Sequence, residues 1–422
     1  MRLLYDIGIL VYFFCARILG LFNHKAALFV SGRKNIISCI QEKMSGRGDR
    51  RTVWFHCSSV GEFEQARPLI ERIREMSPES FIVLTFFSPS GYELRKNYSC
   101  ADAVFYLPMD TSRNARRFLD AVQPSTAIFV KYEFWYNYLT KLKERGVDTY
   151  IISAIFRPNQ VFFHWYGVFM RKVLRCYTTP FVQNEESRRL LAGIGVNNAV
   201  IAGDTRFDQV QAVCRNNDLH NEVMEAFIGE HRVWVAGSTW DEDEYVISKS
   251  LHAVTDAKLI LVPHEVDTSH IKRIQNMFAG FPLILYSKCA GKDSAEWREA
   301  ADAAVILVID TVGMLSKIYK YGSFAYIGGG FSSSGIHNIL EAAIYGCPVV
   351  FGPHYEKFQE ARDLVSLGGA FSISSWKELR PLLEQWVDYP EQLDRPSLIC
   401  SQYVESHLGA SDKIIEHIFK NA

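Results

Sequence analysis

The chain has 422 residues, 48% of them hydrophobic, and a formal net charge of -1. This length predicts two or three domains with large buried cores, and the near-zero charge argues against a nucleic-acid-binding protein that neutralises phosphates over its whole surface. The nine cysteines contain no C-x-x-C pair, so we expect neither a disulfide framework nor a cysteine-bound metal.

The N-terminal segment combines an apolar run with an excess of basic residues. Ile7–Ala16 is apolar throughout, but Asp6 and Arg17 bound it, and a bilayer span needs about 20 apolar residues. Residues 1–51 hold nine Lys or Arg against three Asp or Glu, which suits a surface of anionic lipids. We therefore expect residues 1–24 to be a membrane anchor or an interfacial helix, with the remainder cytoplasmic. A buried core helix followed by a solvated basic loop is the open alternative.

From Arg51 onward, short apolar runs rich in β-branched residues alternate with segments of helical spacing. This pattern predicts parallel sheets that are covered by helices on both faces. The expected strands of the first half are Val53–Cys57, Phe81–Thr85, Ala103–Leu107, Thr126–Val130, Thr149–Ser153, Pro180–Gln183 and Ala199–Ala202. Those of the second half are Val233–Ala236, Lys258–Val262, Leu283–Tyr286, Ala304–Ile309, Phe324–Ile327, Pro348–Phe351 and Ala370–Ile373.

The polar stretch Arg215–Glu222 separates the two series of strands. We therefore predict an N-terminal domain over residues 25–214 and a C-terminal domain over residues 215–422, with the last helix a candidate to pack back on the first domain. Two doubly wound domains imply a cleft between them, and such sheets bind ligands at the carboxyl ends of their strands. The residues that directly follow each strand are thus the candidates for function.

Three such motifs stand out in the first half. Glu62 lies in the first turn of a predicted helix, where the helix dipole favours the negative carboxylate that a general base needs. A merely structural role at that helix end stays open for it. Ser88, Ser90 and Gly91 offer hydroxyl and backbone N–H groups to an anion, or form a plain turn. Glu133 stands among aromatic residues, where a carboxylate is costly unless it is used or paired.

These motifs resemble those of the Kdo transferases, which transfer 3-deoxy-D-manno-octulosonic acid (Kdo), and they follow that family's order. The matching runs are Ser59-Val60-Gly61-Glu62, Ser88-Pro89-Ser90-Gly91, Glu133-Phe134-Trp135, Gln183-Asn184-Glu185-Glu186 and Gly203-Asp204-Thr205-Arg206-Phe207-Asp208. The resemblance implies that Glu62 is the catalytic base, that Glu133 and Arg206 stabilise the transition state, and that Ser88, Ser90 and Gly91 are acceptor-binding candidates. Arg206 replaces the family's usual lysine and keeps its charge but not its point-charge geometry.

The resemblance continues through the second half. The matching runs are Val235-Ala236-Gly237-Ser238-Thr239, Pro263-His264, Asp310-Thr311-Val312-Gly313-Met314-Leu315 and Gly335-Ile336-His337-Asn338-Ile339-Leu340-Glu341-Ala342. By this resemblance the CMP-binding residues are Pro263, His264, Val312, Gly313, Met314, Asn338, Ile339, Leu340 and Glu341, with Glu341 on the ribose. His264 lacks the arginine that usually precedes it, and Met314 stands where an acid is common.

The resemblance implies an α/β glycosyltransferase of the GT-B type, with two doubly wound Rossmann-like domains. The expected reaction transfers Kdo from CMP-Kdo, the donor substrate, to a lipid A precursor (lipid IVA) in lipopolysaccharide synthesis, with inversion at the anomeric carbon. The expected location is the cytoplasmic face of the inner membrane. We expect no cofactor. We also expect no metal ion, on the interpretation that the chain has no Asp-x-Asp motif that would bind a divalent ion.

Two alternatives stay open. Within the same fold, another membrane-associated glycosyltransferase or a sugar-nucleotide epimerase would use a UDP-sugar. In a different class, a non-catalytic nucleotide-binding scaffold on the membrane would leave Glu62 and Glu133 dispensable and facing no common site.

Overall fold

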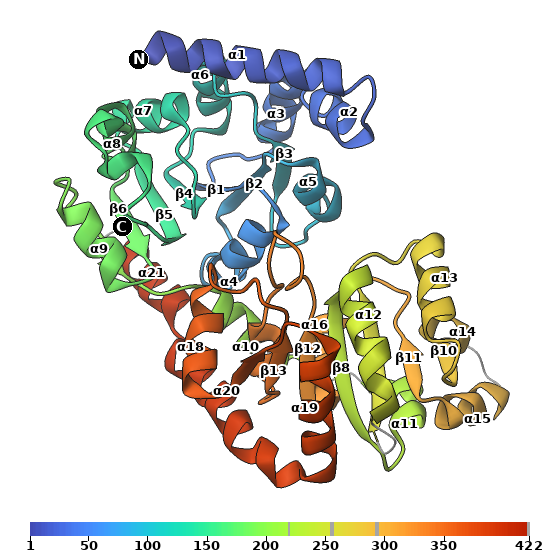
Figure 1. Cartoon of the computed structure of the whole chain (residues 1–422). Helices are drawn as coiled ribbons and strands as arrows, with labels where there is room; N and C mark the ends of the chain where they lie inside the picture. The colour runs from blue at the N-terminus through green and yellow to red at the C-terminus, as the bar shows by residue number, and fades with distance from the viewer. Residues whose placement is uncertain (218–219, 254–256, 292–294, 420–422) are drawn as a thin grey trace. The chain divides into compact units, whose positions relative to one another are not determined.

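The computed structural model describes residues 1–217, 220–253, 257–291 and 295–419, and it divides the chain into two compact units (Figure 1). Unit 1 comprises residues 1–209 and 408–422, and unit 2 comprises residues 210–407. The chain passes from the first unit to the second within helix α10 (Arg206–Arg215). Of the predicted linker Arg215–Glu222, residues 218–219 lie outside the described residues.

Unit 1 is built on a seven-stranded parallel sheet in the order β3-β2-β1-β4-β5-β6-β7. Its strands are β1 (Thr52–Cys57), β2 (Phe81–Phe86), β3 (Ala103–Tyr106), β4 (Thr126–Val130), β5 (Asp148–Ala154), β6 (Thr179–Val182) and β7 (Val200–Ile201). Each overlaps one strand predicted for the first half. The central strands are buried along their whole length, as expected for a parallel sheet with helices on both faces.

Helices cover both faces of this sheet. Alternate residues of a strand point to opposite faces, so one strand packs against the helices on both sides. From β1, Val53, Phe55 and Cys57 pack with helix α4, whereas Trp54 packs with helices α6 and α7. The helices of unit 1 are α1 (Arg2–Leu19), α2 (His24–Ser31), α3 (Ile36–Ser45), α4 (Val60–Met76), α5 (Pro89–Arg95), α6 (Ser112–Val122), α7 (Tyr136–Glu144), α8 (Val168–Leu174), α9 (Glu185–Ala192) and α21 (Ala410–Phe419). Helix α21 adds Ile414, Ile415 and Ile418 to the core on the α4 side.

Helix α1 lies across one end of unit 1, over α6 and α3 (Figure 1). Its inner side is fixed by polar contacts: the Tyr5 hydroxyl donates to Asp110 at 2.6 Å, and the Asn137 side chain donates to Asp6 at 2.8 Å. Its other side exposes large apolar side chains, among them Leu3 at 72%, Leu10 at 58% and Phe14 at 62%. No helix among the described residues is both long and apolar enough to cross a membrane.

Unit 2 holds a second seven-stranded parallel sheet, in the order β10-β11-β9-β8-β12-β13-β14. Its strands are β8 (Arg232–Thr239), β9 (Ala257–Pro263), β10 (Leu283–Leu285), β11 (Ile306–Val308), β12 (Phe324–Ile327), β13 (Val349–Phe351) and β14 (Ala370–Ser372). Each overlaps a predicted strand of the second half. The prediction of an α/β protein with two doubly wound domains is therefore confirmed.

The helices of unit 2 are α11 (Glu222–Ile228), α12 (Asp241–Ser250), α13 (Thr268–Met277), α14 (Tyr286–Cys289), α15 (Ala295–Ala303), α16 (Leu315–Ile318), α17 (Leu340–Ala343), α18 (Gln359–Leu367), α19 (Trp376–Asp388) and α20 (Asp394–Ser406). Several of them have only four residues. One hydrophobic core of this unit joins Trp234 and Tyr326 on the sheet to helices α12, α13 and α19.

Strand order fixes where each sheet has its crevice. In unit 1 the chain winds outward from β1 to β3 and then resumes at β4 beside β1, so the switch point lies between β1 and β4. In unit 2 the corresponding switch point lies between β8 and β12. Ligands of doubly wound sheets bind in the crevice at such points, outside the carboxyl ends of the strands.

Candidate active site

Glu62 lies beside the switch point of unit 1. Strand β1 ends at Cys57, Ser58 and Ser59 turn the chain, and α4 begins at Val60, so that Glu62 falls in the first helical turn. The Ser59 hydroxyl donates a hydrogen bond to the Glu62 carboxylate, which is half-buried. The helix N-terminus stabilises negative charge there. The carboxylate is therefore oriented and still reachable, as a general base requires.

Glu133 lies on the other side of the same switch point, after β4. The chain leaves the strand through Lys131, whose φ of 62° makes the sharp turn, and the Glu133 side chain is buried. Trp135 donates its indole N–H to the Glu133 carboxylate. The fully buried His56 of β1 places its Nε2 atom 3.2 Å from the same carboxylate. Glu133 is thus paired on both sides.

The buried Cys57 thiol shows that Glu62 and Glu133 share one neighbourhood. Burial raises the pKa of Cys57 well above its ordinary value, and the negative charges of Glu62, Glu133 and Glu64 raise it further. Such a charge effect requires both carboxylates to lie near the end of β1. The two acids predicted from separate motifs lie at the same edge of the sheet, because they follow the neighbouring parallel strands β1 and β4.

Arg206 is held by Asp204. Its guanidinium donates to Asp204 at 2.9 Å through Nε and lies 2.8 Å from it through one terminal nitrogen. Although burial alone would raise the pKa of Asp204, the charges of Arg206 and Lys131 lower it below its ordinary value. Asp204 also accepts from Gln65, one turn along α4 from Glu62, at 2.8 Å. The Arg206 motif is thereby tied to the Glu62 helix.

The predicted acceptor motif begins at Ser88 in the turn after β2 and continues into the first turn of α5. The Ser88 and Ser90 hydroxyls lie 2.8 Å apart, and the Ser88 backbone N–H donates at 2.8 Å to the carbonyl of Ser58, in the turn before Glu62. Gly91 is required by packing, because a Cβ there would lie 2.5 Å from the Phe86 ring. Ser88 therefore lies next to the Glu62 turn, while Gly91 has a structural role.

In unit 2, three aromatic rings gather at the carboxyl ends of β8 and β9. His264 stacks on Trp240 and on His337, each with ring centroids 4.5 Å apart. Trp240 donates its indole N–H to Nε2 of His337 at 3.1 Å. Burial, with a contribution from His264, lowers the pKa of His337 to about 4, so His337 accepts this bond as a neutral ring. Trp240 and His337 were not among the predicted site residues.

The glycine turn after β12 closes the unit 2 switch point. A Cβ on Gly328 would lie 2.1 Å from the Ser238 carbonyl oxygen, so this turn passes directly over the end of β8. The Asp243 carboxylate accepts the Gly329 backbone N–H at 2.8 Å and the Tyr326 hydroxyl at 2.9 Å. Asp243 is thus a structural acid that fixes the turn in front of the predicted nucleotide residues.

Asn338 and Glu341 lie together beyond this turn, since the Asn338 amide donates to the Glu341 carboxylate at 3.1 Å. Between them, Ile339 and Leu340 have buried side chains, so only their backbone could contact a ligand. The expected helix N-terminus is short, because α17 begins at Leu340 and has only four residues. A ligand there would depend on side chains and loop N–H groups more than on a helix dipole.

The remaining predicted nucleotide residues follow β9 and β11. Pro263 is the buried last residue of β9. Val312 and Gly313 are exposed, Val312 at 80%, and Gly313 has a φ of 88° with open space around its Cα. Met314 caps α16, and its sulfur accepts from the Thr311 hydroxyl at 3.4 Å. This loop is free to approach a ligand through its backbone.

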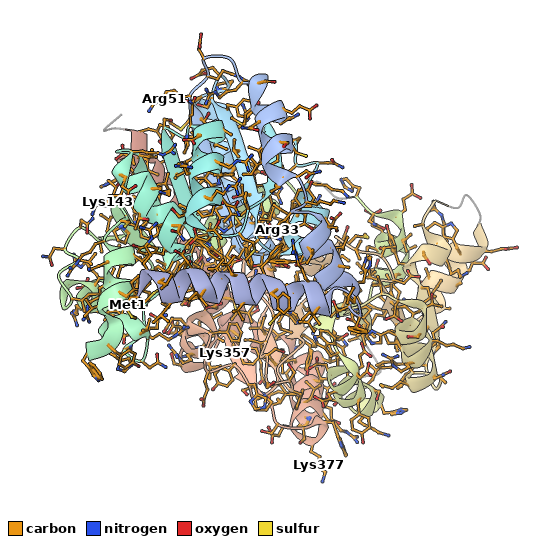
Figure 2. The ribbon with its side chains drawn as sticks, turned by 90° about the horizontal axis from the view of Figure 1, so that it is seen from above. Met1, Arg33, Arg51, Lys143, Lys357 and Lys377 are labelled. Carbon is orange, nitrogen blue, oxygen red and sulfur yellow. The ribbon has the colours of Figure 1, made fainter. Side chains whose placement is uncertain are left out.

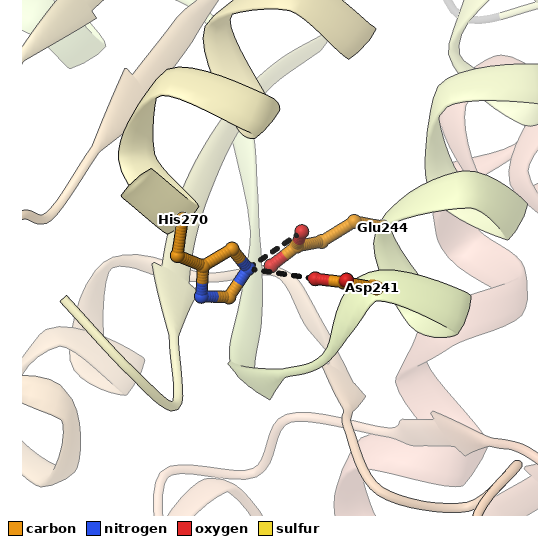
Figure 3. Close-up of side chains that lie close together, drawn as sticks. All are labelled: Asp241, Glu244 and His270. Carbon is orange, nitrogen blue, oxygen red and sulfur yellow. Dashed lines mark hydrogen bonds and ion pairs between the residues drawn. The ribbon is translucent and has the colours of Figure 1, made fainter. Parts of the chain in front are cut away.

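One group of side chains in unit 2 has the composition of a metal site (Figure 3). His270 places Nε2 3.0 Å from Glu244 and 3.3 Å from Asp241, and within the described residues no other such group of three potential ligands occurs. The expectation of no metal overlooked the Asp-x-Asp pair Asp241 and Asp243, of which only Asp241 joins this group. His270 and Glu244 are fully buried and bonded to each other, so an ion would have to replace their hydrogen bond.

Comparison with known proteins relates these features to a family. Residues 34–209 match the family described as 3-deoxy-D-manno-octulosonic-acid transferase (Kdo transferase). The 3-deoxy-D-manno-octulosonic acid transferase of Aquifex aeolicus is 24% identical over 358 residues, which cover 83% of this chain and 90% of that protein. The corresponding protein of Haemophilus influenzae is 25% identical and is matched over 86% of both chains.

Along most of its length the chain resembles the Kdo transferases, and residues 34–209 match that family. A bifunctional glycosyltransferase/methyltransferase of Fusobacterium nucleatum is also similar, at 22% identity, but this chain spans only 54% of its length.

Solved structures support the GT-B fold of this chain. A UDP-GlcNAc 2-epimerase from Neisseria meningitidis aligns with a TM-score of 0.63 at 15% identity, over 87% of this chain and all of that one. MurG from Acinetobacter baumannii aligns with a TM-score of 0.52 at 10% identity, over 88% of this chain and 98% of that one. At these identities the likeness concerns the fold alone. The likeness to the Kdo transferases identifies the chain as a glycosyltransferase.

Proposed function

We propose that this chain moves Kdo from CMP-Kdo to a lipid A precursor, with inversion and without a metal ion. The observation that carries the proposal is the position of Glu62 and Glu133 after the paired strands β1 and β4, on the two sides of the unit 1 switch point. A sugar transfer needs a base for the acceptor hydroxyl and a second group near the reacting carbon. Glu62 is the reachable carboxylate and Glu133 the buried, fixed one.

In the proposed reaction, Glu62 accepts the proton of an acceptor hydroxyl. The freed oxygen attacks the anomeric carbon of Kdo from the face opposite CMP, and a carbon–oxygen bond forms. The bond from the anomeric carbon to the phosphate oxygen breaks, and its electron pair leaves with CMP. Arg206, which Asp204 holds through two contacts, is proposed to offer positive charge to the developing anion.

The donor nucleotide is proposed to bind unit 2 at the residues after β9, β11 and β12. Glu341, steadied by Asn338, would accept the ribose hydroxyls, and the open Gly313 loop would approach the phosphate through its backbone. The aromatic group of Trp240, His264 and His337 would form one wall for the cytosine ring.

We propose further that α1 rests in the surface of the cytoplasmic face of the inner membrane. Figure 2 views the molecule from the α1 side. The inner side of α1 is bonded to unit 1, and its outer side exposes apolar residues from Leu3 at 72% to Leu19 at 58%. The exposed basic residues Lys25 and Lys34 follow the helix in the chain. A helix with this division and basic neighbours is typical of interfacial binding to anionic lipids.

The decisive experiment incubates the purified chain with CMP-Kdo and lipid A precursor and weighs the products by mass spectrometry. We expect a mass increase of one or more Kdo units, retained after exhaustive chelation. Glu62→Gln should lower the transfer rate at least about 1,000-fold while leaving CMP binding unchanged, because it removes the base and keeps the side-chain shape. Glu64→Gln, two residues along α4, is the matched control and should stay active. Normal turnover by Glu62→Gln would overturn the base assignment, and a strict metal requirement would overturn the metal-free scheme.

A further inference from the structure

A cavity of about 500 Å³ lies beneath α1 in unit 1, apart from the catalytic carboxylates. Helix α1 lines it with Tyr12, Ala16 and Leu19, helix α2 with Ala26 and Phe29, and the end of β2 with Phe87. Its volume falls within the range of about 300 to 1,000 Å³ that is usual for small-molecule sites, which are mostly apolar with few polar groups. The lining is therefore suited to a hydrocarbon chain rather than to a sugar.

The floor of this cavity is built rigidly. Phe29 and Phe87 meet edge to face with ring centroids 5.1 Å apart, and Tyr12 of α1 packs against both rings. Beneath them, the buried guanidinium of Arg33 donates to the carbonyls of Phe29 and Phe87, at 2.9 and 2.7 Å. This bonding fixes α2 against the end of β2, so the cavity does not depend on a loosely placed segment.

The same floor adjoins the catalytic residues. The Phe87 ring packs on Trp135 with centroids 4.8 Å apart, and Trp135 donates to the Glu133 carboxylate. Ser88, which lines the cavity, is bonded through its backbone N–H to Ser58 in the turn before Glu62. A ligand that fills the cavity would therefore end beside the turn that carries the proposed base.

The lining of the cavity carries a single charge. Of its eleven lining residues, Lys25 alone is charged, and it is exposed. Leu19, which also lines the cavity, is 58% exposed and continues into the apolar outer side of α1. An amphiphile with an apolar tail and an anionic head matches this arrangement.

We infer that this cavity binds one acyl chain of the acceptor lipid and thereby places the acceptor's sugar beside Glu62. The inference rests on the proposed function, because it names a further subsite for the same acceptor. An apolar chain gains free energy with each methylene that it buries, so the subsite adds affinity for acylated acceptors only.

Cys15 makes the inference testable without any transfer reaction, because its thiol is exposed and lines the cavity. The full chain in detergent is alkylated by a maleimide, and modification of each cysteine is followed by peptide mass spectrometry. We expect the acylated lipid A precursor to slow alkylation of Cys15 at least about fivefold. The deacylated sugar phosphate should have no such effect, and phosphatidylglycerol should protect Cys15 less than the acceptor does. Cys39, exposed on α3, is the internal control.

A second thiol distinguishes a ligand in the cavity from burial of the whole of α1 in detergent. Phe14→Cys places a thiol on the outer side of α1, next to Cys15. Shielding of α1 by detergent or bilayer would slow both thiols, whereas an acyl chain in the cavity slows Cys15 alone. Equal protection of both thiols, equal protection by phosphatidylglycerol, or no protection of Cys15 would overturn the inference.

Filling the cavity gives an independent kinetic test. Ala16→Phe should raise KM for the acylated acceptor about tenfold and leave KM for the deacylated acceptor within twofold. Ile18→Phe, which adds an aromatic ring on an exposed position of the same helix, is the matched control and should change neither value. Equal effects of Ala16→Phe on both acceptors would count against the inference. Absence of transfer by the unaltered chain would overturn the proposed function, while the thiol result would still decide the fate of the acyl subsite.

Discussion

His56 lies against the Glu133 carboxylate near the end of β1. Its Nε2 atom lies 3.2 Å from that carboxylate without hydrogen-bond geometry, and its Nδ1 atom lies 2.9 Å from the Thr85 hydroxyl, so the ring is held at the Thr85 edge. We expect His56→Asn to lower kcat for Kdo transfer about 10- to 100-fold with little change in KM, since a displacement of about 1 Å in a positioned group can cost about 100-fold in rate.

A double-mutant cycle distinguishes this positioning role from a general loss of stability. If His56 acts through Glu133, adding His56→Asn to Glu133→Gln should cost little more than Glu133→Gln alone, because both changes remove the same contact. Additive losses in kcat, or a loss that follows the melting temperature alone, would contradict the assignment.

His337 makes unit 2 sensitive to acid. Burial and the neighbouring His264 lower the pKa of His337 to about 4, below the ordinary value of about 6.5 for an unfolded histidine. On acidification, the unfolded chain therefore takes up a proton at His337 before the folded chain does. The contribution of His337 to the free energy of unfolding is complete above pH of about 6.5 and is lost as the pH falls toward 4. After allowance for screening at the partly exposed edge of the ring, protonation of His337 lowers the free energy of unfolding by about 2 kcal/mol.

The measurement compares the unfolding midpoint of unit 2 at pH 7 and pH 4.5 in the unaltered chain and in His337→Asn. We expect the variant to lose less stability on acidification, because it has no imidazole to protonate. His252→Asn, at an exposed position, serves as the control. The same acid sensitivity in His337→Asn and the unaltered chain would show that the ring does not control it.

At the scale of elements, the docking of α1 depends on one buried acid. Asp110 accepts the Tyr5 hydroxyl at 2.6 Å and the backbone N–H groups of Asn137 and Tyr138 at 3.0 Å each. Tyr5→Phe removes the bond to α1 and leaves Asp110 with one donor fewer, a loss of about 1 to 3 kcal/mol. We expect faster hydrogen exchange along α1. Tyr132→Phe, at an exposed tyrosine, should leave α1 unchanged; equal exchange in both variants would mean that Tyr5 does not hold the helix.

The elements themselves were predictable because parallel strands that are buried on both faces are continuous apolar runs. Strands β4 and β12 have the predicted bounds, and the others differ only at their ends. Helices α16 and α17, which begin at Leu315 and Leu340, have only four residues each, which is too short for a helical spacing of apolar residues to appear. Apolar spacing does not reveal where a loop between a strand and a helix becomes helical.

The site could be predicted only in part, for a similar reason. Glu62 and Glu133 directly follow strands, so their meeting at one sheet edge could be inferred from chain order. The contacts that orient the site join distant residues: Gln65 bonds Asp204 139 positions away, and Trp240 bonds His337 97 positions away. His56 and Trp240 look like ordinary core aromatics in the sequence, and only the fold gives them partners.

For the whole molecule, the choice of donor decides between the proposed transferase and an enzyme that uses a UDP-sugar. The two units have separate cores, so a ligand that binds unit 2 should raise the unfolding temperature of that unit specifically. A ligand present at 100 times its Kd adds about 2.7 kcal/mol to the free energy of unfolding. We expect CMP to produce such a shift and UDP to produce none, as measured by calorimetry on the full chain. Glu341→Gln should abolish the CMP shift, because the amide no longer offers two acceptor oxygens to the ribose, whereas Glu62→Gln in unit 1 should retain it. A larger shift with UDP than with CMP would favour a UDP-sugar enzyme on the same fold, and a CMP shift that survives Glu341→Gln would move the nucleotide away from the Asn338–Glu341 pair.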